Sequence, residues 1–120
     1  MSLSINYNIE NITKFQKILQ DNKSIIIIKF SAGWCGPCSK MKPYFNEYMK
    51  LLPNNIEYYF LDVDENEEIY SFLKKKKMIN GIPAIVAYYK DNTTYIPNDI
   101  VIGFNINQLQ LFFERCQKHI

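Results

Sequence analysis

Residues 24–31 form the most constraining feature of the sequence, a run that contains four consecutive isoleucines beginning at Ile25. β-Branched side chains favour strands, and a strand that is apolar at successive positions is buried on both faces. Such strands lie in the middle of parallel or mixed sheets, where helices cover the two faces. The run therefore predicts a layered α/β fold with this strand near its centre.

The rest of the chain alternates helical and extended patterns. Further strands are expected at residues 4–7, 56–62, 84–89 and 94–102, and helices at 11–20, 36–52, 67–76 and from 105 onward. Alternation of strands and helices implies right-handed crossovers, and a turn at Asp91 and Asn92 would make the last two strands an antiparallel hairpin. We therefore predict a single domain, residues 1–120, with a central mixed sheet of four to five strands and helices on both faces.

Composition excludes several functions. The 120 residues are 48% apolar with a net charge of +2, too little charge to favour nucleic acid or a membrane surface. No segment approaches the roughly 20 apolar residues that span a bilayer, and the N-terminus lacks the regions of a signal peptide. We therefore predict a cytoplasmic monomer with no nucleic-acid or membrane partner. In that reducing compartment a close cysteine pair is expected to be catalytic or metal-binding.

Cys35 and Cys38 flank Gly36 and Pro37, directly after the apolar strand and at the start of the next helix. The free N–H groups and partial positive charge of a helix N-terminus favour a thiolate at Cys35, and the thiolate is the attacking species in disulfide exchange. The spacing places Cys38 one turn along the same side of the helix, and Gly36 and Pro37 keep that turn tight. The pattern predicts that Cys35 attacks a target disulfide and that Cys38 then resolves the mixed disulfide.

Zinc binding is the alternative use of such a pair, because Cys116 and His119 would supply two more ligands. Cys116, however, continues an apolar helical stripe with Leu109, Phe112 and Phe113. A cysteine in such a stripe is expected to be a small buried hydrophobe. We therefore predict no metal site.

The segment FSAGWCGPC, residues 30–38, resembles the active-site signature of thioredoxins, and the resemblance extends along nearly the whole chain. Residues 61–66 resemble the end of the family's third strand, and residues 81–84 (GIPA) resemble its cis-proline segment. The resemblance implies a thioredoxin fold and a protein-disulfide reductase. Cys35 would be the exposed nucleophile and Cys38 the buried resolving thiol.

The same resemblance implies a substrate groove and a set of partners. Trp34 would flank the cysteines and hold targets, and the backbone of Ile82 would pair with a substrate strand. Pro83 would have a cis bond and lie against the cysteines, while Gly103 would keep a third side open. Substrates would be protein disulfides. The protein would bind no cofactor itself, and a flavin-dependent thioredoxin reductase using NADPH would reset its redox-active disulfide, Cys35–Cys38.

The central strand departs from the family pattern. Where the family usually has a buried aspartate that accepts the resolving cysteine's proton, this sequence has Lys29, and where the family commonly has a lysine on the third strand it has Phe60. Lys29 is expected to extend its ammonium to water, to pair with Asp62, or to act on the cysteines as a cation or a neutral base. An altered redox poise or pH dependence follows from the last of these.

Two other functions remain open at this point. The first is an adaptor module whose groove docks a partner with little turnover, because Lys29 and Phe60 displace the usual proton relay. The second is a more oxidising, isomerase-like protein, against which the Gly-Pro pair argues mildly.

Overall fold

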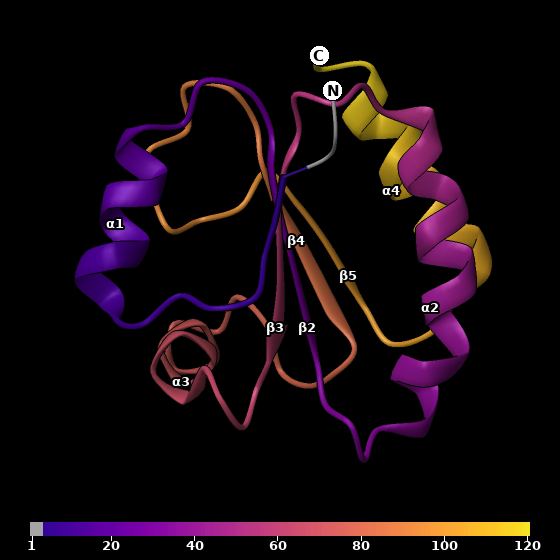
Figure 1. Cartoon of the computed structure of the whole chain (residues 1–120), viewed down its shortest axis with the longest axis horizontal. Coiled ribbons are helices and arrows are strands. Elements are labelled where there is room, and N and C mark those ends of the chain that lie inside the picture. Colours follow the sequence, from indigo (N-terminus) through magenta and orange to yellow (C-terminus); the bar gives the residue numbers. More distant parts are fainter. Residues whose placement is uncertain (1–3) are drawn as a thin grey trace.

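The isoleucine-rich run occupies the middle of the sheet, as predicted. In the computed structural model, which describes residues 4–120, strand β2 (Ile26–Ser31) lies between β3 (Glu57–Asp62) and β4 (Ala84–Tyr88) (Figure 1). The strand order is β1-β3-β2-β4-β5, where β1 is Ser4–Asn6 and β5 is Asp99–Ile102. β1 and β2 run parallel to β3, whereas β4 is antiparallel to both β2 and β5. The predicted mixed α/β sheet is therefore confirmed.

Helices cover both faces of this sheet. In Figure 1, α1 (Ile12–Gln20) and α3 (Glu67–Lys75) lie on one side, and α2 (Gly36–Tyr48) and α4 (Ile106–Gln117) lie on the other. α2 continues into a short 3-10 turn, η1 (Met49–Leu51). The longest helix of the described residues has 13 residues, and no helix among these residues is long and apolar enough to cross a membrane.

Successive residues of β2 belong to opposite faces of the sheet. Ile26, Ile28 and Phe30 pack in the core under α1 and α3. Ile27 packs in the core under α2 and α4. Lys29 follows it on that second face and is itself buried. The lysine thus occupies a position that the strand pattern otherwise reserves for an apolar side chain.

Two buried asparagines fasten loops to this framework. The N–H of Ile9 donates to Asn66 Oδ1 at 2.9 Å, and Asn66 Nδ2 donates to the carbonyl of Asp62 at 3.0 Å. Asn22 Nδ2 donates to the carbonyl of Tyr89 at 2.8 Å. Because the Ile9–Asn66 and Asn22–Tyr89 pairings each cross more than 50 residues of chain, hydrophobic periodicity gave no indication of them.

The last strand is shorter than predicted. Residues 94–102 were expected to be extended, but β5 comprises only Asp99–Ile102. Pro97 has no N–H to give to a ladder, and the N–H of Thr94 donates to Asn92 Oδ1 at 2.9 Å, which holds the chain in a local turn. The connection between β4 and β5 is therefore a loop rather than a tight hairpin.

Tyr58 and Tyr88 offer a matched test of core packing. Tyr88 Oη donates to the carbonyl of Tyr95 at 2.8 Å, whereas Tyr58 Oη has no partner among the described residues. A buried hydroxyl without a partner costs about 1–3 kcal/mol, so we expect Tyr58→Phe to leave the free energy of unfolding unchanged or to raise it by about 1 kcal/mol. Tyr88→Phe should lower it by about 1 kcal/mol. Urea unfolding measures both, and a greater loss in Tyr58→Phe would contradict the expectation.

Candidate functional site

The cysteine pair lies where the chain passes from β2 into α2. Cys35 is the residue that caps the helix, with an extended backbone (φ −90°), and Cys38 lies in the first turn. The two form a disulfide with their Cα atoms 5.3 Å apart. The backbone N–H of Cys38 points at Cys35 Sγ, 3.2 Å away. Pro37 fits this first turn because an N–H there would have no partner within the helix.

This geometry favours a thiolate at Cys35 once the disulfide is reduced. The N–H of Cys38 and the partial positive charge of the helix N-terminus both act on Cys35 Sγ. The expected contrast between an exposed Cys35 and a buried Cys38 is wrong for the disulfide-bonded form, because the two residues are 6% and 7% exposed. Bonded together, both sulfur atoms pack as one unit against the core that contains Phe30 and Ala84.

Trp34, the residue before Cys35, lines one end of a groove. The residue is 71% exposed, and its Nε1 donates to Asp64 Oδ2 at 2.8 Å, which fixes the orientation of the indole. The groove has a volume of about 780 Å³ and continues from Trp34 along α3 to Ile82. Within the described residues no hydrogen bond joins the Ile82 backbone to another residue, and Ile82 lines this groove.

The segment that leads into β4 lies next to the end of β2. The Ile82–Pro83 peptide bond is cis, as the resemblance implied. The antiparallel pairing of Phe30 with Ala84 brings Pro83 beside the chain that leaves β2 toward the cysteines. Gly103 has φ +83°, a conformation that favours glycine, and its N–H donates to the carbonyl of Pro83 at 2.7 Å. The proline and glycine segments are therefore joined side by side.

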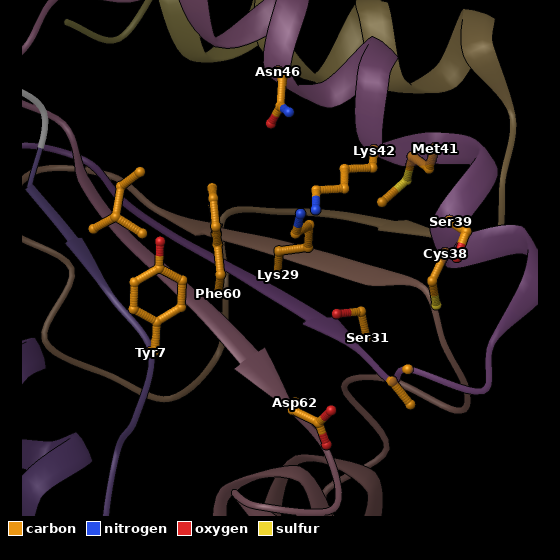
Figure 2. A pocket seen from close by; sticks show the side chains of 13 residues that line it. Tyr7, Lys29, Ser31, Cys38, Ser39, Met41, Lys42, Asn46, Phe60 and Asp62 are labelled. Carbon is orange, nitrogen blue, oxygen red and sulfur yellow. The ribbon is translucent and has the colours of Figure 1, made fainter.

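A second cavity, of about 530 Å³, lies between the sheet and α2 (Figure 2). Lys29 and Cys38 both line it. Lys29 is only 7% exposed, and its Nζ lies 4.2 Å from the ring centre of Phe60 and 4.7 Å from that of Phe45. Aromatic faces attract a cation. The lysine thus keeps its stem in the core while its ammonium faces the cavity.

The expected pairing of Lys29 with Asp62 does not occur. No ion pair among the described residues includes Lys29. Asp62 lies two residues beyond Phe60 along β3, opposite Ser31, and its Oδ1 accepts the N–H of Asp64 at 2.8 Å. The carboxylate therefore accepts a hydrogen bond within the turn after β3 and does not pair with the buried ammonium.

Burial lowers the pKa of Lys29 from 10.5 to about 8, and the charge of Lys42 contributes to the shift. At neutral pH the side chain is consequently still protonated for the most part. It is therefore a cation in the cavity that Cys38 also lines, and it becomes neutral only in mildly alkaline solution. Sequence reasoning missed Lys42, although its position one turn after Cys38 on α2 was a usable signal.

Cys116 lies far from this chemistry. It is fully buried on α4, in the core on the α2 side of the sheet, and burial raises its pKa to about 12. His119 instead stacks on Tyr89, with ring centres 4.1 Å apart. Residues 4–120 contain no group of three or more side chains that could hold a metal ion. The two halves of the zinc alternative are therefore not brought together.

Fold and site together define a class of protein: an α/β domain that carries a redox-active cysteine pair at the start of a helix, beside a cis-proline. The family model described as Thioredoxin matches residues 6–112. The chain belongs to the thioredoxin family.

Individual relatives agree with this assignment. Thioredoxin of Geodia cydonium is 42% identical over 92 residues, which cover 76% of this chain and 79% of that protein. Thioredoxin 3 of Plasmodium falciparum is 29% identical over 114 residues, 93% of this chain, but the match spans only 59% of that longer protein. The structure of mitochondrial Thioredoxin 3 from Saccharomyces cerevisiae superimposes with a TM-score of 0.70 at 25% identity and covers 92% of this chain and 94% of that one.

Lys29 gives the stability of the protein a specific pH dependence. Because its folded pKa of about 8 lies below the ordinary value of 10.5, the buried ammonium destabilises the fold fully below pH 8. The penalty disappears as the pH rises toward 10.5. We expect the free energy of unfolding of the wild type to gain about 3 kcal/mol relative to Lys29→Met across this interval.

Urea unfolding of both proteins at several pH values measures this difference. Lys40→Met, on the exposed side of α2, controls for the loss of a positive charge as such. A constant difference between the wild type and Lys29→Met from pH 7 to 10.5 would show that Lys29 is not desolvated.

Proposed function

We propose that this protein reduces protein disulfides through a mixed disulfide on Cys35. The observation that carries the proposal is the N–H of Cys38 directed at Cys35 Sγ, at the start of α2 and beside an open groove. A helix N-terminus lowers the pKa of a thiol, and the thiolate is the form that attacks disulfides. The proposal is narrower than family membership, because members of one fold family differ in the direction of exchange.

Two exchange steps complete the reaction. The Cys35 thiolate attacks one sulfur of the target disulfide; the target S–S bond breaks, and the departing sulfur takes up a proton. The Cys38 thiolate then attacks Cys35 Sγ, and the second target sulfur leaves and is protonated. The target has gained two electrons and two protons, and the protein retains the Cys35–Cys38 disulfide.

The groove supplies the substrate contacts in this proposal. Trp34, oriented by Asp64, covers one side of a bound chain. The unpaired backbone of Ile82 hydrogen-bonds to that chain as a neighbouring strand would. Pro83 and Gly103 form the third side, where the absence of a Cβ at Gly103 lets the target backbone approach. Gly36 and Pro37 keep the turn between the cysteines free of bulky side chains.

The partners follow from the chemistry. The protein needs a donor of two electrons to return to the dithiol, and we propose a flavin-dependent thioredoxin reductase that draws on NADPH. The protein itself carries no cofactor in this proposal, since both electrons reside in the cysteine pair. We further propose that it acts as a monomer in the cytoplasm.

Catalysed reduction of a model protein disulfide by dithiothreitol tests the function. We expect turnover with the wild type and only the uncatalysed rate with Cys35→Ser, which lacks the attacking sulfur. Cys38→Ser should stop after the first step and accumulate the target on Cys35, visible as a mass increase that dithiothreitol removes. Cys116→Ser is the matched control and should keep full activity, because Cys116 is buried on α4.

The same assay separates the alternatives. One-to-one capture of the target by the wild type without turnover would favour the adaptor. Preferential oxidation of dithiols over reduction of disulfides would favour the isomerase-like protein. Unchanged turnover by Cys35→Ser would exclude the proposed mechanism altogether.

Lys29 is proposed to tune the potential of the pair. Its ammonium shares a cavity with Cys38 and stabilises the thiolate of the reduced protein. In Lys29→Met the reduced form loses this support, so we expect a potential more negative by on the order of 10–30 mV, where about 30 mV corresponds to a tenfold change in the equilibrium constant. The apparent pKa of Cys38 should rise in the same variant.

Equilibration with a glutathione buffer at pH 7 measures the potential, and the pH–rate profile of disulfide reduction reports the thiol pKa. Lys40→Met again controls for net charge. Lys29→Asp places an anion at the same position and should differ from the wild type in both measurements. Identical potentials and profiles for the wild type and Lys29→Asp would exclude a tuning role.

A further inference from the structure

Two lysines from different elements meet in the cavity beside Cys38. Lys29 rises from β2 and Lys42 descends from α2, and Figure 2 shows their amino groups pointing toward each other. Their mutual repulsion is strong enough to contribute to the lowered pKa of Lys29. Like charges placed this way destabilise a fold, and an anion between them would remove the penalty.

The negative charge that the protein itself brings to the cavity is remote from these amino groups. Among the residues that the structure describes, Asp62 is the one carboxylate that lines it. Figure 2 shows Asp62 beyond Ser31, at the far end of the cavity from Lys42. Its Oδ1 is engaged by the N–H of Asp64. The ammonium of Lys29, a residue only 7% exposed, therefore enters the cavity with no anionic partner among residues 4–120.

Neutral hydrogen-bond donors surround the two cations. The hydroxyl of Ser31 on β2 and the amide of Asn46 on α2 line the same cavity, as does Tyr7 at its edge. Ser39 also lines it, although its hydroxyl donates to the carbonyl of Cys35 at 3.4 Å. A pair of ammonium groups with hydroxyl and amide donors around them is a set that suits the oxygens of a phosphate or sulfate group.

We propose that this cavity binds a small oxyanion, a phosphate or sulfate group, between the amino groups of Lys29 and Lys42, with Ser31 and Asn46 as further donors. The volume of about 530 Å³ exceeds what four oxygens fill, and it lies within the range of small-molecule pockets. A phosphate monoester therefore fits as well as the free ion. The site does not depend on the disulfide-exchange function, because its ligating groups are neither of the cysteines.

Thermal unfolding of the oxidised 120-residue chain tests the site. Sodium sulfate is the probe, and sodium chloride at the same ionic strength of about 0.15 M is the reference. A ligand that binds only the folded state raises Tm in a saturable way, and we expect a plateau on the order of 3 °C. In Lys29→Met and in Lys42→Gln, the sulfate concentration that gives half of the rise in Tm should increase at least about tenfold. Lys40→Gln, on the same helix but outside the cavity, should respond as the wild type does.

The variants also control for the general effect of sulfate, which stabilises most proteins because it is excluded from their surface. A rise that is linear in sulfate and equal in all four proteins would be this general effect only and would overturn the proposal. Lys42→Gln alters an exposed residue, so the test stands even if Lys29→Met does not fold.

Two further probes identify the source of the oxyanion. Inorganic phosphate and glycerol 3-phosphate are compared at the same ionic strength in the wild type and Lys42→Gln. Equal saturable responses indicate a site for the free group, and a lower half-saturating concentration of the monoester indicates a phosphorylated metabolite. Failure of sulfate and of both phosphates to distinguish the wild type from Lys42→Gln would exclude the site.

Discussion

The close packing of β2 on both edges and both faces determines where the chemistry of this protein takes place. β3 and β4 pair with the strand on either side, and helices cover it above and below. The chain that leaves such a strand has one exit, at the carboxyl end of the sheet, and there it turns through Cys35 directly into α2. The same pairing places Pro83 beside this exit. A rigid strand thus positions the helix N-terminus, the disulfide and the cis-proline together.

Lys29 is the feature by which this chain departs from the family pattern, and the structure shows how the fold tolerates it. A charge in the core under α2 and α4 would be costly if it were surrounded by aliphatic side chains. The faces of Phe45 and Phe60 stabilise the ammonium, and the cavity under α2 keeps it next to polar groups. Phe60, opposite Lys29 on the neighbouring strand β3, thus contributes to this stabilisation.

Local sequence patterns predicted most of the elements and the reactive pair. The helix start at Cys35 follows from a strand, a glycine and a proline that are adjacent in the chain, and the stripe from Leu109 to Cys116 on α4 was buried as its spacing indicated. The cis bond before Pro83 came from resemblance alone, since no local pattern requires it. The length of the last strand, the exposure of Cys35 and the pairing of Lys29 with Asp62 were wrong. The environment of Lys29 depended on how β2 meets β3 and α2, whereas the last strand was shortened by Pro97 and by the local turn at Asn92.

The sequence by itself determined the alternation of strands and helices and the placement of a dithiol at a helix N-terminus, because these depend on periodicity and on neighbours within one turn. Tertiary structure alone decided which groups meet across the sheet and under α2. Asn66 holds the segment at Ile9, and Lys42 faces Lys29, because sheet order and helix packing set distances between segments that local propensity does not encode. The charge environment of the cavity is therefore a property of the fold, although every residue in it can be read from the chain.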